Sequence, residues 1–168
     1  RFGIIGAGPI GSIISKKLVK NGHDVKIADA RGIERLEGKE LAGTAVHVEE
    51  AIKNIEILII SLPIKALPSI QNIIDQVGEE VIIVDTSNYY PFRDGKIEEI
   101  ENGMIESVWV SNQLGRPIIK AFNNLLAYTL EHEGKSEDSS GRIAMAVAGN
   151  NQSQKQVVMR SEEHTSEL

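Results

Sequence analysis

The sequence contains no cysteine among its 168 residues. Disulfide bonds, thiolate metal ligands and cysteine nucleophiles are therefore excluded, and we expect a protein of a reducing compartment, the cytoplasm. The four histidines do not have the spacing of metal ligands, so we also expect no metal site. They are His23, His47, His132 and His164.

Aromatic residues, basic charge and long apolar runs are also scarce. Aromatics make up 4% of the chain, and 18 basic residues face 24 acidic ones, for a net charge of −6. Without a basic, aromatic-rich face we expect no nucleic-acid partner. The longest apolar run, residues 55–62, is far shorter than the ~20 residues of a membrane helix, so we expect no membrane segment. We also expect no secretion signal before the first strand.

What the sequence does contain is a regular alternation of apolar strands and amphipathic helices. The pattern predicts strands at 2–5, 25–28, 43–48, 57–61, 81–85, 117–121 and 143–148, and helices at 10–20, 33–41, 67–77, 106–114, 123–132 and 152–159. Several strands are apolar throughout, which indicates burial on both faces. We therefore predict an α/β fold with a doubly wound, mostly parallel sheet and ligands at the carboxyl ends of its strands.

The last residues of the chain are expected to be non-native, the alternative being a native acidic helix tail. Residues 160–168 resemble the in-frame translation of a common sequencing-adapter oligonucleotide. We therefore expect one domain over residues 1–159, truncated at its C-terminal end, followed by a non-native tail at 160–168.

A glycine motif joins the first strand to the first helix: Gly6-Ala7-Gly8-Pro9-Ile10-Gly11. In a strand–turn–helix context, Gly6 allows the tight turn, Gly8 lets the backbone approach a pyrophosphate, and Gly11 permits close packing. The phosphates then bind the free N–H groups of the helix N-terminus. The alternative is a glycine-rich turn without a ligand. We predict a Rossmann-type βαβ unit that binds NADP(H) or NAD(H).

The end of the second strand carries two opposed signals about the cofactor. Asp29 lies about 20 residues beyond the motif, where a carboxylate accepts hydrogen bonds from the ribose hydroxyls of NAD. Arg31 follows two positions later and could bind the 2′-phosphate of NADP. We favour NADP(H) and keep NAD(H) as the alternative.

Short polar or small residues follow three further strands. They are Ser61-Leu62-Pro63, Ser87-Asn88 and Ala121-Phe122-Asn123. We predict that Ser61, Leu62, Pro63, Ser87, Asn88, Ala121 and Asn123 line the cofactor's ribose and nicotinamide. The alternative role is turn and helix capping. Trp109 is predicted to lie in the core, and Tyr89-Tyr90 either to plug a loop or to stack on a substrate.

The chain resembles the coenzyme F420 (deazaflavin)-dependent NADP oxidoreductase family through the glycine motif and four further segments: Asn21-Gly22-His23-Asp24-Val25, Ile59-Ile60-Ser61-Leu62-Pro63, Lys120-Ala121-Phe122-Asn123 and Ala146-Val147-Ala148-Gly149-Asn150. It is similar to a subgroup of predicted dinucleotide-binding enzymes through the string Asp85-Thr86-Ser87-Asn88-Tyr89-Tyr90-Pro91-Phe92-Arg93-Asp94-Gly95. That family commonly has Asn-Ser-Arg-Gly where this chain has Asp29-Ala30-Arg31-Gly32. The arginine is retained and the serine is not. The resemblance implies hydride transfer between NADP(H) and a deazaflavin, flavin or related small-molecule acceptor, with a homodimer in the full-length protein.

No side-chain constellation of a known catalytic type is visible, so we assign no catalytic residue. Hydride transfer needs aligned cofactors more than a catalytic side chain. Two alternatives stay open. One is a β-hydroxyacid-type dehydrogenase whose further domain is missing here, and the other is a nucleotide-sensing domain without turnover.

Overall fold

The sheet of this protein contains six parallel strands in the order β3-β2-β1-β4-β5-β6. The computed structural model describes residues 1–135 and 139–166, with side chains up to residue 160. The strands are β1 (Phe2–Ile5), β2 (Val25–Ala28), β3 (Thr44–Ala45), β4 (Ile57–Ile60), β5 (Ile82–Asp85) and β6 (Ile119–Lys120). This order confirms the predicted α/β fold with a parallel Rossmann-type sheet.

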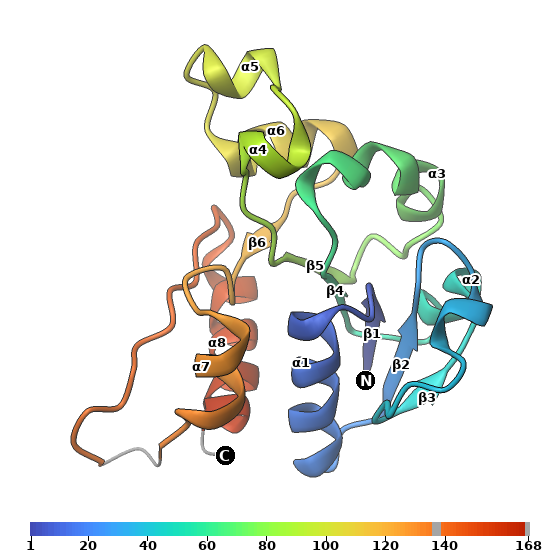
Figure 1. Cartoon of the computed structure of the whole chain (residues 1–168), viewed down its shortest axis with the longest axis vertical. Helices are drawn as coiled ribbons and strands as arrows, with labels where there is room; N and C mark the ends of the chain where they lie inside the picture. The colour runs from blue at the N-terminus through green and yellow to red at the C-terminus, as the bar shows by residue number, and fades with distance from the viewer. Residues whose placement is uncertain (136–138, 167–168) are drawn as a thin grey trace.

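Helices cover both faces of the sheet, as a doubly wound fold requires (Figure 1). One face packs against α1 (Pro9–Lys20), α7 (Ala127–His132) and α8 (Gln152–Ser166). The other packs against α2 (Val48–Ala51), the 3₁₀ helix η2 (Ile64–Ile70), α3 (Gln71–Ile74) and α6 (Glu106–Leu114). Two short helices, α4 (Pro91–Asp94) and α5 (Glu98–Glu101), extend beyond the carboxyl edge of the sheet (Figure 1).

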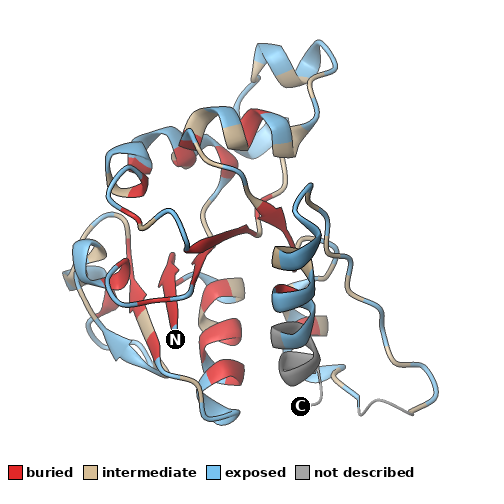
Figure 2. Cartoon of the chain, turned by 180° about the vertical axis from the view of Figure 1, so that it is seen from behind, coloured by how far each residue is buried: buried red, intermediate tan, exposed pale blue. Residues whose placement is uncertain are grey.

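The central strands β1, β4 and β5 are buried on both faces, because consecutive side chains of a strand enter different hydrophobic cores. In β4, Ile57 and Ile59 belong to the core under α1, whereas Leu58 and Ile60 belong to the core under η2 and α6. All four are nearly inaccessible, and the central strands stand out as buried in Figure 2, whereas β3 is exposed. This explains the continuous apolar runs of the sequence.

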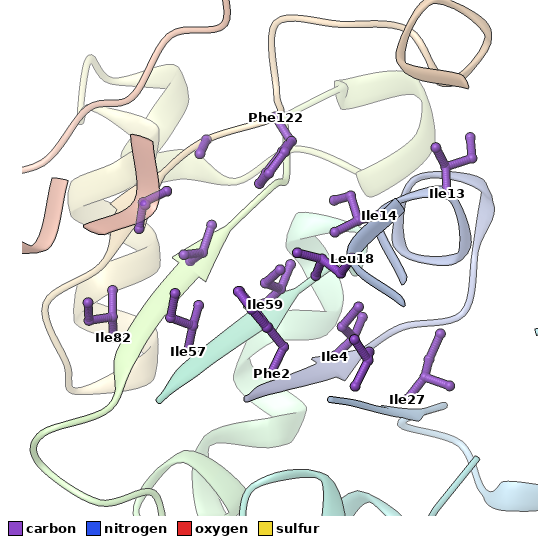
Figure 3. Packing of buried hydrophobic residues seen from close by; sticks show 14 of the residues in the cluster. Phe2, Ile4, Ile13, Ile14, Leu18, Ile27, Ile57, Ile59, Ile82 and Phe122 are labelled. Atoms are coloured by element: carbon purple, nitrogen blue, oxygen red, sulfur yellow. The ribbon is translucent and has the colours of Figure 1, made fainter. Parts of the chain in front are cut away.

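Helix α1 forms because Pro9 suits its first turn and apolar residues recur at helical spacing. Ile14 and Leu18 point from it toward the sheet (Figure 3), and Ile13 belongs to the same buried cluster. The helix ends at Asn21, and Gly22 follows with φ 79°. That left-handed conformation favours glycine at a helix end.

Three predicted elements differ from the structure. The strand expected at 143–148 is wrong, since that segment makes a single antiparallel bridge between Lys120 and Ala148. The helix expected at 33–41 shortens to the 3₁₀ helix η1 (Ile33–Leu36), before Gly38 with φ 72°. The strand expected at 43–48 reduces to β3.

Helical boundaries differ as well. Pro68 removes a backbone donor, so the predicted helix at 67–77 becomes η2 followed by the short α3. The helix expected at 123–132 begins at Ala127. The last helix, expected to end at Met159, runs on to Ser166. The side chains of residues 161–168, which include most of the predicted tail, lie outside the described part of the chain.

Candidate dinucleotide-binding site

The phosphate loop connects β1 to α1, and two of its glycines are required by close backbone contacts. Gly6 has φ +114°, and a Cβ there would lie 2.1 Å from the carbonyl oxygen of Ser61. A Cβ on Gly11 would lie 2.0 Å from the carbonyl oxygen of Gly6. Neither position can take a side chain without displacing the loop, and both roles agree with the sequence prediction.

Gly8 has the opposite surroundings, because a Cβ built there meets nothing within 4 Å. Gly8 is the N-cap of α1, Pro9 occupies the first turn, and that turn has no acidic residue. The first N–H groups of a helix lack intrahelical partners and carry partial positive charge. Within the loop, Ala7 is buried and Ile10 packs against the core. The open, glycine-lined helix terminus therefore fits a pyrophosphate.

Asp29 and Arg31 form a bidentate pair after β2. Asp29 Oδ1 accepts hydrogen bonds from the backbone N–H and the Nε–H of Arg31, and Oδ2 accepts one from Nη2, all at 3.0 Å. These bonds hold the pKa of Asp29 below its usual range. The carboxylate side chain is 6% exposed and the guanidinium side chain 68%. Arg31 is thus held in place at the surface, and Asp29 is already occupied.

Lys39 is a further cation at this end of the site that the sequence did not predict. Its ammonium group donates to the carbonyl oxygen of Ala7 at 3.2 Å, directly beside the phosphate loop. It also contributes to lowering the pKa of Asp29. Its position could not be read from the sequence, because it depends on how the irregular segment after η1 folds back over the loop.

The residues after β4 lie against the phosphate loop. The N–H of Ser61 donates to the carbonyl of Ile5 at 2.8 Å, and the Cβ of Ser61 would be 3.2 Å from one built on Gly11. Leu62 is half-buried, and Pro63 is the exposed N-cap of η2. The structure therefore brings the predicted residues Ser61, Leu62 and Pro63 together with the glycine motif.

The ends of β5 and β6 are joined through two asparagines. The Asn88 amide donates to the carbonyl oxygen of Asn123 at 2.8 Å, and the Asn123 amide donates to Asn88 Oδ1 at 3.2 Å. Ala121 is buried and donates its N–H to Asp85. Phe122 then turns the chain with φ 61°. The structure thus brings Asn88, Ala121 and Asn123 together.

An ion pair missed by the sequence analysis lies under these asparagines. Lys120 Nζ is 2.7 Å from Asp85 Oδ2, with side-chain exposures of 10% and 0%. Ser87 donates its N–H to Asp85 Oδ1 and its hydroxyl to Oδ2, both at 3.0 Å. Ser87 is therefore engaged in a turn around Asp85. In the sequence, the only sign of this ion pair was that a lysine and an aspartate end two apolar strands.

The two tyrosines after Asn88 have different surroundings. Tyr89 packs against the core, its hydroxyl donates to Glu101 at 2.7 Å, and the N–H of Ile97 donates to that hydroxyl at 3.0 Å. Tyr90 is exposed, with the Arg93 guanidinium 4.9 Å from its ring centroid. Tyr89 therefore plugs the loop, whereas Tyr90 stays accessible. Trp109 is buried, as predicted.

The sheet order gives the site two ends. Asp29 and Arg31 follow β2 on one side of β1, whereas the asparagines follow β5 and β6 on the other.

The described residues contain no group of acidic or histidine side chains able to hold a metal. Within the same part of the chain no helix is long and apolar enough to span a membrane.

Known structures show the same fold. A hypothetical protein from Sinorhizobium meliloti has a TM-score of 0.79 at 24% identity, covering 99% of this chain and 81% of its own. A protein assigned as an F420-dependent NADP-reductase from Arthrobacter sp. FB24 has a TM-score of 0.74 at 17% identity, covering 97% and 80%. The NADP-bound pyrroline carboxylate reductase of Plasmodium falciparum has a TM-score of 0.66 at 12% identity, covering 99% and 55%. No curated protein matches the chain.

The family described as "NADP oxidoreductase coenzyme F420-dependent" matches residues 1–89, which include the glycine motif, the Asp29–Arg31 pair and the wall after β4. The matched segment thus covers the phosphate loop and the residues that follow β2 and β4. This chain belongs to the coenzyme F420-dependent NADP oxidoreductase family and contains its NAD(P)-binding Rossmann domain.

Proposed function

We propose that this protein is an NADP(H)-dependent oxidoreductase that passes a hydride between NADP(H) and a deazaflavin, flavin or related acceptor. The open N-terminus of α1 above Gly8 is the observation that carries the proposal, because it fits a pyrophosphate and a Cβ built at Gly8 meets no atom of the described residues within 4 Å. Family membership supports the choice of reaction. Residues 1–159 form the nucleotide-binding unit in this proposal.

The preference for NADP(H) is supported by the state of the Asp29–Arg31 pair. A carboxylate that is free to bind ribose hydroxyls favours NAD, but Asp29 gives both its oxygens to Arg31. Nη1 of the exposed guanidinium takes no part in that pair. It can donate a charge-assisted hydrogen bond to a 2′-phosphate. Lys39 adds positive charge beside the phosphate loop.

The remaining residues of the site position the two ends of the dinucleotide. Gly6, Gly8 and Gly11, with Ala7, Pro9 and Ile10 between them, form the pyrophosphate loop. Ser61, Leu62 and Pro63 wall the central part of the crevice. Asn88, Ala121 and Asn123, with Ser87 as support, lie where the nicotinamide half is expected from the strand order. The bound nicotinamide supplies the hydride chemistry, and the chain supplies alignment.

The test is oxidation of NADPH by the protein with deazaflavin, flavin and ferric acceptors offered separately. We expect acceptor-dependent oxidation with a deazaflavin or flavin. Tight binding of NADPH without oxidation by any acceptor would overturn the enzymatic proposal and favour a nucleotide sensor. Turnover with β-hydroxyacids instead would identify the dehydrogenase alternative.

A further inference from the structure

The Lys120–Asp85 pair is placed by the register of the sheet. The two residues are direct partners in the β5–β6 ladder, and each is the last residue of its strand. Lys120 Nζ donates to Asp85 Oδ2 at 2.7 Å and to Ser87 Oγ at 3.4 Å. Two opposite charges are therefore buried together at the carboxyl end of the sheet.

This buried pair lies directly below the asparagine bridge. Ser87, which wraps around Asp85, is the neighbour of Asn88 in the chain, and Ala121 leads from Lys120 toward Asn123. In the function proposed above, the nicotinamide half occupies this end of the crevice. The pair would then be a buried pair of charges at the same end of the crevice as the nicotinamide ring.

The two redox states of the cofactor differ at that ring. The oxidised ring carries one positive charge and the reduced ring is neutral, while the phosphates are the same in both. A single buried charge near the ring would therefore favour one state over the other, since burial weakens screening by water. A pair of opposite charges with no net charge leaves the relative affinity for the oxidised and reduced cofactor nearly unchanged.

From this geometry we infer that Lys120 neutralises Asp85 in order to keep the site from favouring the oxidised cofactor. Lys120 is thus a positioning and charge-compensating residue, which acts on the cofactor through Asp85. The inference rests on the proposed function, since it requires the nicotinamide at the β5–β6 end.

The experiment measures dissociation constants of NADP⁺ and NADPH for the wild type and three variants. In Lys120→Met, the uncompensated carboxylate should shift the affinity ratio toward NADP⁺ on the order of tenfold. In Asp85→Asn, the uncompensated ammonium should shift the ratio toward NADPH. The double variant Asp85→Asn/Lys120→Met should have the wild-type ratio.

Opposite shifts separate this role from a structural one, because a disturbed fold weakens both redox forms alike. Breaking a buried pair is destabilising, so each single variant is first shown to be folded by thermal unfolding, and its affinity ratio is measured on the folded protein. The double variant leaves neither charge of the pair and shows whether the shifts of the single variants come from charge. Lys53→Met, which breaks the exposed pair between Lys53 and Glu50, is the matched control and should not change the ratio.

Equal changes in both affinities in a single variant, or a shifted ratio in the double variant, would overturn the inference. The proposed function fails in a different way, through absence of NADPH binding or of acceptor-dependent oxidation in the wild type. The two failures are therefore distinguishable.

Discussion

Gly8 shows how the lack of one side chain can serve a ligand and not the fold. The space above it is open, whereas the space at Gly11 is filled by the backbone of Gly6. We predict that Gly8→Val abolishes binding of NADPH while leaving the melting temperature close to wild type. Titration calorimetry on the folded variant, beside thermal unfolding, measures both.

Gly11→Val is the matched control for that substitution. It should lower the melting temperature, since its Cβ would lie 2.0 Å from the carbonyl oxygen of Gly6. If Gly8→Val bound NADPH with near wild-type affinity, the phosphate loop would not be part of the binding site.

A second prediction at the residue scale concerns Asp29 and Arg31. Wild type should bind NADPH more tightly than NADH, and Arg31→Ala should weaken NADPH about ten- to a hundredfold, the effect of one charge-assisted contact. NADH should not be weakened by this change. Asp29→Asn removes a negative charge beside the 2′-phosphate and should tighten NADPH.

Dissociation constants of both nucleotides for the three proteins decide the matter. If wild type preferred NADH and lost that preference in Asp29→Asn, the carboxylate would be binding the ribose hydroxyls. The assignment of NADP would then be wrong.

Among the elements, the loop between α3 and β5 is joined to the segment before β6 by one arginine. Arg116, just before β6, donates to the carbonyl oxygens of Val77 at 3.0 Å, Gly78 at 3.1 Å and Glu79 at 3.2 Å. We predict that Arg116→Ala lowers the free energy of unfolding by about 1–3 kcal/mol, because partly buried carbonyls lose their donors. Chemical denaturation measures this loss.

Arg116→Lys keeps the charge but not the planar fork of donors, so it should recover only part of the stability. Full recovery with lysine would show that charge alone, and not the shared carbonyl contacts, joins these elements.

The last helix offers a prediction about the end of the chain. Val158 is 2% exposed and packs against the core under α1. Val158→Ala should cost about 1–3 kcal/mol of stability, whereas deletion of residues 160–168 should leave the melting temperature unchanged. A drop on deletion as large as that of Val158→Ala would mean that these residues are part of the native fold.

The elements also show what sequence can predict. The strands around β4 and the helix α1 follow from local periodicity, and the glycine motif follows from fixed offsets, so both were predicted. A strand also needs a partner with free backbone groups. The continuous apolar run at 143–148 predicted a strand, yet only Ala148 pairs with β6.

Pairings across the sheet are beyond such local signals. Asp85 and Lys120 are 35 residues apart and meet only because of the β5–β6 register. Likewise Lys39 reaches Ala7 only through the path of an irregular segment. The Asp29–Arg31 pairing is local, but sequence does not fix side-chain rotamers, so both residues were predicted while their bidentate contact was visible only in the structure.

For the whole molecule, cofactor binding should be visible as thermal stabilisation. The site draws on β1, β2, β4, β5 and β6, so its ligand bridges segments that unfolding would separate. We predict that NADPH raises the melting temperature more than NADH at equal concentration, with about 2.7 kcal/mol of stabilisation at one hundred times its dissociation constant.

A scanning-fluorimetry series at rising nucleotide concentration measures this shift. Added salt should reduce the advantage of NADPH, because part of it comes from charge at exposed Arg31. Equal shifts with both nucleotides at every salt concentration would contradict a 2′-phosphate contact.

The bridge between Lys120 and Ala148 has a consequence for the protein in a crowded cell. An open strand edge is a template on which another chain can add a strand and begin to aggregate. Here the segment around Ala148 exchanges two backbone hydrogen bonds with Lys120, at 2.8 and 2.9 Å, and so covers the outer edge of β6. At the opposite edge β3 is only two residues long. Residues 143–148, which form a single bridge and no strand, thus protect the outer edge of the sheet from pairing with other protein chains.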